Sequence, residues 1–221
     1  DSSRLVRANY NTVTPEKVYS YEVGYKGIIG KKLLVDAYFY INRYKSFLVS
    51  EAVVQSTTSR KQEVYSPYSS VNLSYTQNST EDVNSQGWGI GIDYEFIKKF
   101  TLYANVSSDV LDDDLPAGQV TFFNAPKYRC NIGLRNDNMY KGLGFNMVFK
   151  WQDNNYYEGT FVSGTLPYFG WLDAQVSFRP YGTKSVFRAG GTNIGNFYAR
   201  TGFGSPAVGG LYYISYGYNI F

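Results

Sequence analysis

Small or polar side chains, several of them charged, occupy every second position in several stretches of this 221-residue chain. In "VYSYEVGYKG", Glu22 and Lys26 alternate with bulky residues, and in "GWGIGIDYEF", Asp93 and Glu95 do the same. Charges of both signs on one surface bind other charged groups through ion pairs and charge-assisted hydrogen bonds. Histidine-dependent catalytic groups and histidine metal sites are excluded in this chain, because it contains no histidine. The sequence therefore favours recognition and does not indicate an enzyme.

The candidate recognition residues lie on one face of the expected strands, opposite the bulky residues. Three glycines join them, because consecutive glycines on one face suggest the close approach of another chain segment. The alternatives are ordinary polar lining, with charges paired between neighbouring strands, and strand curvature at the glycines. The candidates are Glu22, Lys26, Gly87, Gly89, Gly91, Asp93, Glu95, Arg129, Arg135, Asp173, Arg179 and Arg188.

Aromatic residues in the long connections form a second candidate group. The stretches "NNYYEG" and "LPYFGW" supply Tyr156, Tyr157, Tyr168 and Trp171, whose rings can stack on a solute. For Tyr168 and Trp171, a girdle at a membrane interface is the alternative. The acidic run at residues 112–114 indicates a solvated loop and not a metal site.

The elements that carry these residues are predicted to be strands. Strict alternation of bulky and small or polar residues has the period of a strand, in which successive side chains point to opposite faces. Such a strand spans a bilayer with about 9 to 11 residues although only every second residue is apolar. The mean hydropathy of −0.32 is therefore compatible with a membrane protein. The nine expected strands lie near residues 18–27, 33–47, 87–96, 100–108, 128–136, 143–152, 172–180, 186–194 and 212–221.

The connections between these strands alternate strictly between short and long. Short polar turns near residues 30, 98, 140 and 182 alternate with long connections at 50–82, 110–126, 153–168 and 197–210. Outer-membrane barrels have this arrangement, with short periplasmic turns and long extracellular loops. The sequence thus predicts an all-β, transmembrane antiparallel β-barrel, with the apolar face in lipid and the charged face in the lumen. A soluble β-sandwich lectin is the alternative.

The number and direction of the strands predict that more of the barrel precedes this chain. If the short turns are periplasmic, the first strand starts outside the cell and the ninth ends in the periplasm. Complete single-chain bacterial barrels have an even number of strands. Residues 1–221 are therefore expected to be the C-terminal part of a larger barrel.

Longer motifs resemble TonB-dependent outer-membrane transporters. Within that family they are most similar to members from Bacteroidetes, which include the SusC-like group. The resemblance is carried by "VTPEKVYSYEVGYKGIIGKKLLVDAYFYINRYKSFL", "FNAPKYRCNIGL", "GGTNIGNFY" and "GGLYYISYGYNIF". The family implies a 22-stranded barrel plugged by an N-terminal domain, of which this chain holds about nine strands and no plug. One departure is that Phe221 falls out of register with the apolar face.

The resemblance implies active import of a scarce solute, such as a siderophore, vitamin, oligosaccharide or peptide. The implied partners are the missing plug, the TonB–ExbB–ExbD complex, outer-membrane lipid and, for a SusC-like member, a SusD-like surface lipoprotein. A passive structural or adhesion barrel is the alternative function. No cofactor is implied, and the basic residues do not cluster as they do in nucleic-acid-binding proteins.

Overall fold

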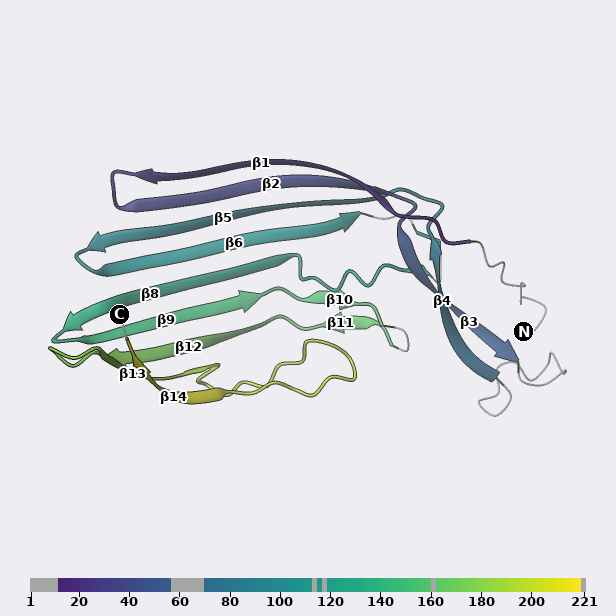
Figure 1. Cartoon of the computed structure of the whole chain (residues 1–221). Helices are drawn as coiled ribbons and strands as arrows, with labels where there is room; N and C mark the ends of the chain where they lie inside the picture. Colours follow the sequence, from purple (N-terminus) through teal and green to yellow (C-terminus); the bar gives the residue numbers. More distant parts are fainter. Residues whose placement is uncertain (1–11, 57–69, 113–114, 117–118, 160–161, 220–221) are drawn as a thin grey trace.

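The computed structural model describes residues 12–56, 70–112, 115–116, 119–159 and 162–219. Within these residues, nine strands form one antiparallel sheet (Figure 1). In spatial order they are β1 (Lys17–Ile29), β2 (Leu33–Lys45), β5 (Val83–Ile97), β6 (Phe100–Asp112), β8 (Tyr128–Tyr140), β9 (Leu143–Gln152), β12 (Phe169–Phe178), β13 (Ser185–Thr192) and β14 (Leu211–Tyr218).

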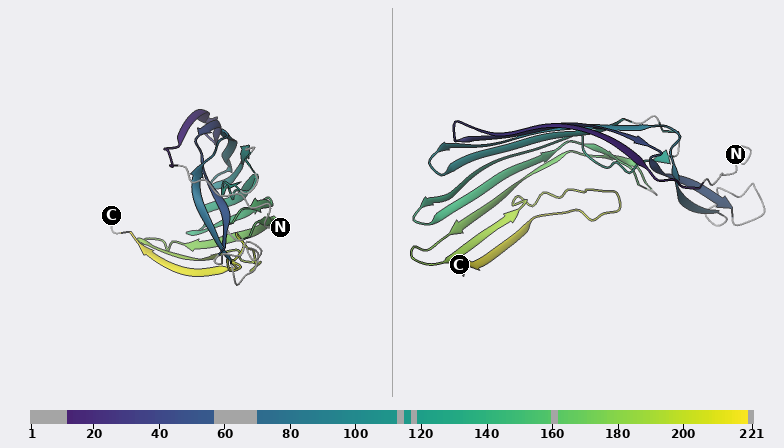
Figure 2. Two further views of the ribbon diagram at one scale, coloured as in Figure 1. Left: turned by 90° about the vertical axis from the view of Figure 1, so that its right-hand side faces the viewer. Right: turned by 45° about the horizontal axis from the view of Figure 1, so that its top comes forward.

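The connections of this sheet follow the predicted order. The turns β1–β2, β5–β6, β8–β9 and β12–β13 lie together at one end of the sheet, which we call the short-turn end, and the long connections lie at the other (Figure 1). The sheet is curved along its width, as the turned views show (Figure 2). The predicted nine strands and the alternation of short and long connections are therefore confirmed.

The long connections contain strands that the sequence did not predict. Strands β3 (Leu48–Ser56), β4 (Ser70–Asn78) and β7 (Gln119–Val120) form a small sheet, and β10 (Asn155–Tyr157) and β11 (Gly164–Leu166) extend the β9–β12 hairpin. Strands of two or three residues are too short for an alternating pattern to reveal. In β3 the apolar residues come in adjacent pairs, as at Val53 and Val54, and this also hides the strand period.

The register of the large sheet separates two faces. Val23 lies opposite Phe39, Phe39 opposite Trp88 and Ile132 opposite Phe149, so that the bulky residues share what we call the apolar face. The other, charged face carries the alternating residues, including Glu22, Asp93, Arg129 and Arg135.

The apolar face is not covered by any other element of the described chain. Large side chains on it remain exposed, with Val23 at 67% and Ile132 at 52%. The buried hydrophobic residues among those described lie in or beside the long connections, at Val49, Val83, Leu166 and Ala199. A β-sandwich buries its apolar face against a second sheet, and the described strands make no such packing. The lectin alternative is therefore wrong.

Glycines on the charged face make room for tyrosine rings from the neighbouring strand. A β-carbon on Gly87 would lie 2.5 Å from the Tyr40 ring, and one on Gly89 would lie 2.5 Å from the Tyr38 ring. Beside Gly91 the nearest atom would be 3.8 Å away. The sequence suggested that another chain segment or strand curvature explains these glycines. At Gly87 and Gly89, rings of the same sheet fill the space.

This arrangement predicts that two alanine substitutions on one strand differ in effect. Gly87→Ala should destabilise the full-length protein by about 1–3 kcal/mol, because the added methyl group overpacks against the Tyr40 ring. Gly91→Ala, on the same face of β5, should leave stability unchanged or slightly raised, because the site is open. For both variants, the detergent-purified protein is heated in steps and run on a gel on which folded and unfolded barrels migrate differently. The temperature at which the folded band disappears gives the unfolding temperature. Equal unfolding temperatures for the two variants would contradict the ring contact.

Candidate functional site

Ion pairs join the strands of the sheet across the charged face. Three of them join adjacent strands, and the pair of Arg135 with Asp93 spans the strand between β8 and β5. The Lys26 ammonium lies 2.6 Å from Asp36, Arg135 lies 3.1 Å from Asp93, and Lys150 lies 2.8 Å from Asp173. Arg129 pairs with Asp109. Candidates Lys26, Asp93, Arg129, Arg135 and Asp173 thus pair between strands, the alternative that the sequence left open.

Neutral side chains complete this lining with hydrogen bonds. Tyr40 donates to Asp109 (2.7 Å), and Tyr103 donates to Asn146 (2.7 Å). The Asn131 amide donates to Asn105 over 2.8 Å. Alternation placed all of these residues on the charged face, but the sequence did not indicate which of them would bond. Buried or half-buried polar side chains that satisfy each other form a rigid, hydrophilic surface.

Four other candidates do not belong to these pairs. Glu22 and Arg188 make no hydrogen bond or ion pair within the part of the chain that the structure describes. Glu95 accepts a hydrogen bond from the Lys99 amide (3.2 Å), and Arg179 donates to the Asp137 carbonyl (3.3 Å), so both bind short turns.

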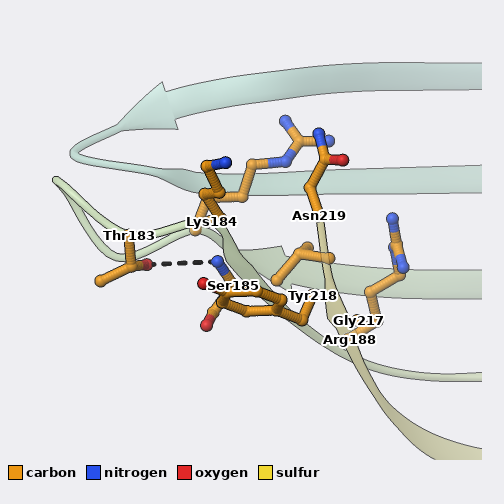
Figure 3. Close-up of a pocket in the computed structure, with 9 residues that line it drawn as sticks. Thr183, Lys184, Ser185, Arg188, Gly217, Tyr218 and Asn219 are labelled. Carbon is orange, nitrogen blue, oxygen red and sulfur yellow. Dashed lines mark hydrogen bonds between the residues drawn. The ribbon is translucent and has the colours of Figure 1, made fainter. Parts of the chain in front are cut away.

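Arg179 and Arg188 come together at a pocket of about 620 Å³ between the ends of β13 and β14. Figure 3 shows the labelled side chains around it, with Lys184 near Thr183 and Ser185 on one side and Arg188 on the other. None of the described residues that line it carries a carboxylate side chain. Arg179 and Arg188 were both candidates from the sequence, but only the β12–β13 turn brings them together.

The aromatic candidates of the long connections fall into separate places. Tyr156 is exposed, while the Tyr157 ring packs edge-on against Phe203 at 5.9 Å. Trp171 stacks on Phe169 at 4.8 Å and lies opposite Lys150, which places it on the charged face of the sheet.

Tyr168 instead borders a groove of about 450 Å³ between residues 165–169 and the β13–β14 connection. Its lining includes the rings of Phe169, Tyr198 and Phe203 and one cation, Arg200. The last three residues were missed from sequence because they are far from Tyr168 along the chain, although the aromatic "GNFYAR" stretch offered a signal.

Asn193 holds the β13–β14 connection against the sheet. Its backbone amide donates to Asp173 (2.7 Å), and its side chain both donates to the Phe197 carbonyl and accepts from the Phe197 amide. Asn193 has a positive φ of 50°, a conformation that asparagine tolerates better than most residues. Asp173 therefore links Lys150 on the charged face to the loop that forms the groove.

Glu158 fixes two further connections to each other. Its carboxylate accepts hydrogen bonds from the Thr121 amide and hydroxyl and from the Phe122 amide, at 2.8–3.0 Å. Asn124 bonds both backbone groups of Glu158. Charge-assisted bonds of this kind give the region between β7 and β10 a defined shape.

Two expectations fall partly outside the described residues. The acidic run extends to residues 113 and 114 and the closing aromatic is Phe221, and neither is described; nor are residues 1–11. Among the described residues there is no cluster of three or more metal-ligating side chains. The same part of the chain has no helix long and apolar enough to cross a membrane.

The family model described as "TonB dependent receptor-like, beta-barrel" matches residues 4–194. The chain belongs to this family. No curated protein matches the chain. Barrels of the outer membrane carry an apolar band outside and a polar interior, which are the two faces seen here.

Solved structures with a similar fold are transporters and receptors. The copper transporter OprC has a TM-score of 0.70 at 14% identity over 93% of this chain. The FrpB iron transporter from Neisseria meningitidis has 0.67 at 13% over 95%. The siderophore receptor PirA from Acinetobacter baumannii has 0.66 at 16% over 93%. The chain spans only 31%, 31% and 32% of these three proteins.

Contact of the apolar face with lipid can be tested at Cys130, the single cysteine of the chain. Cys130 lies opposite Val106 and Trp151 on the apolar face. In the full-length protein, with any other cysteines replaced, a nitroxide label attached to Cys130 should collide with oxygen, which dissolves in lipid, and be protected from a water-soluble nickel complex. The same label on an Asn131→Cys variant, in a Cys130→Ala background, should collide more with the nickel complex than with oxygen. Equal access of the nickel complex to both labels would contradict lipid contact.

Proposed function

We propose that this chain is the C-terminal part of a TonB-dependent importer that takes up a scarce solute across the outer membrane. The observation that carries the proposal is that this chain has the fold of a receptor barrel wall. The similar fold covers more than nine tenths of this chain but only about a third of each of the three solved transporters and receptors. The remaining two thirds would supply the other strands of a 22-stranded barrel and the N-terminal plug.

In this proposal the long connections face the outside and the short turns and the C-terminus face the periplasm. The groove around Tyr168 and Arg200 would form part of the external binding site, because aromatic rings and a cation can hold a solute that has both flat and charged parts. Tyr156, Tyr157 and Trp171 would contact the solute nearer the entrance or the lumen.

The charged face would form the lumen wall. Its ion pairs and hydrogen bonds give the moving solute and the plug a hydrophilic surface whose strong charges are neutralised locally. Glu22, which has no bond within the described wall, would bind the plug. The coupling of TonB, ExbB and ExbD to the plug would supply the energy for import.

The class of solute is inferred from two directions. Neighbours named for iron, siderophore and copper support a metal or its chelate. The resemblance of the motifs to Bacteroidetes members keeps vitamins, oligosaccharides and peptides in the panel of candidates, with a SusD-like lipoprotein as the partner of a SusC-like importer. The alternative, a passive structural or adhesion barrel, has no supporting observation in the fold.

The intact mass of the native polypeptide, taken from purified outer membranes, is the first measurement. We expect a mass about three times that of this 25.0 kDa chain, since the chain spans about a third of its structural neighbours. A mass near 25.0 kDa would show that these nine strands close alone or with a partner chain. The import proposal would then be wrong.

Uptake in living cells tests the energised step. Cells that carry the full-length gene should accumulate one solute of a panel of ferric siderophores, copper, cobalamin, oligosaccharides and peptides. Deletion of the gene, loss of TonB or addition of a protonophore should each reduce that uptake at least about tenfold, because the plug stays closed without energy input. Uptake that persists without TonB would favour a passive barrel.

A further inference from the structure

Two tyrosine side chains of the sheet cross over a glycine of the adjacent strand. Their hydroxyl groups donate hydrogen bonds to side chains of the strand after that one. Tyr40 lies opposite Gly87, which lies opposite Asp109, and the Tyr40 hydroxyl donates to that carboxylate over 2.7 Å. Tyr213, Gly190 and Gln175 form the same series, with a bond of 2.8 Å. The glycine leaves the space through which the long side chain passes.

Two further side chains also bond the second strand along. Tyr103 covers Gly133 of β8 and donates to Asn146 of β9. Arg135 of β8 reaches across β6 to Asp93 of β5. These four long side chains on the charged face therefore find their partners two strands away, whereas Lys26, Arg129 and Lys150 pair with an adjacent strand.

For the four side chains that bond the second strand along, the direction of reach follows the direction of the strand. Tyr40 and Tyr103 lie on β2 and β6, which run away from the short-turn end, and both reach forward in the strand order. Arg135 and Tyr213 lie on β8 and β14, which run toward that end, and both reach back. Side chains lean along their strand, so antiparallel neighbours lean in opposite directions.

Arg188 follows the same pattern but lacks its partner. It lies on β13, which runs away from the short-turn end, so it should reach forward across β14. Its guanidinium Nη1 would lie 3.8 Å from a β-carbon at Gly217 of β14 (Figure 3). Beyond β14 the sheet of the described residues ends. The other four cations that the nine strands place on the charged face, Lys26, Arg129, Arg135 and Lys150, all pair with an aspartate.

We propose that the strand that pairs with the free edge of β14 carries an inward-facing Asp or Glu, opposite Ser215 or Gly217, and that this carboxylate pairs with Arg188. This inference rests on the proposed closure of the barrel by strands outside this chain. In the proposed function those strands belong to the same polypeptide, as the structural neighbours, about three times as long as this chain, would support. The pocket beside Arg188 is where that carboxylate enters, and the described residues that line it include cations and no acidic side chain.

The pair would select the strand that closes the barrel. Backbone hydrogen bonds at a free edge accept any strand, and a shift by two residues keeps the same faces. A single charge pair across β14 fixes both the partner and the register, because a shifted strand leaves Arg188 without its carboxylate.

A charge-reversal cycle in the full-length protein tests the pair. R188E should speed unfolding of the detergent-purified barrel about tenfold, the effect of losing one charge pair. Reversal of the carboxylate on the strand facing β14 should do the same. The double reversal should restore the rate to within about twofold of the native protein. If R188E does not assemble, R188Q and the neutral amide variant of the facing carboxylate form the cycle instead, and the double variant should then unfold no faster than either single variant.

The control is K98E, a charge reversal in the exposed β5–β6 turn, which should leave the unfolding rate unchanged. Coupling of Arg188 to a carboxylate of the plug, or to none on the facing strand, would overturn the proposal. Unfolding reports on barrel closure and not on uptake. A barrel that shows the coupling but imports nothing would contradict the proposed function alone, whereas an importer without the coupling would contradict only this pair.

Discussion

The constraint on which the whole structure depends is that one face of the sheet is apolar and nothing in the described chain covers it. Exposed Val23, Ile132 and Phe149 would be costly in water, at about 25 cal/mol for each Å². Lipid removes that cost and leaves no hydrophobic force to pack a core. Most polar side chains of the wall then turn to the other face, because successive residues of a strand alternate. The charged face is thus a direct consequence of the apolar one.

Crowding the polar residues on one face creates the second feature of the structure. Charges there are close enough to pair, and four of the five cations that the nine strands place on this face pair with an aspartate of the same sheet. Glycines such as Gly87 and Gly133 let tyrosine rings lie flat across a strand and reach the next partner. A wall built this way is stiff and locally neutral, which would suit the lumen surface of the proposed importer.

The ends of the strands have different tasks. The short turns need only reverse the chain, and Lys31, Lys99 and Lys141 do so with positive φ angles. The long connections instead pack on each other, through Glu158 with Thr121 and through Asn193 with Asp173. Because Asp173 also binds Lys150, the shape of the outer groove is tied to the charged face of the wall. A solute bound at the groove and a segment inside the barrel would therefore act on one connected set of residues.

The sequence by itself determined the nine strands, their two faces and the ends at which short and long connections lie, because a period of two residues is a local property of the chain. It also identified the residues of the charged face, including Arg129, Asp173 and Arg188. The tertiary structure alone decided which of them meet. Tyr40 and Asp109 are 69 residues apart, and Tyr168 and Arg200 border one groove from separate connections. Such contacts depend on strand register, on the direction in which each side chain leans and on the position of the glycine beneath it. The alternation pattern of a single strand determines none of these, because each involves a neighbouring strand.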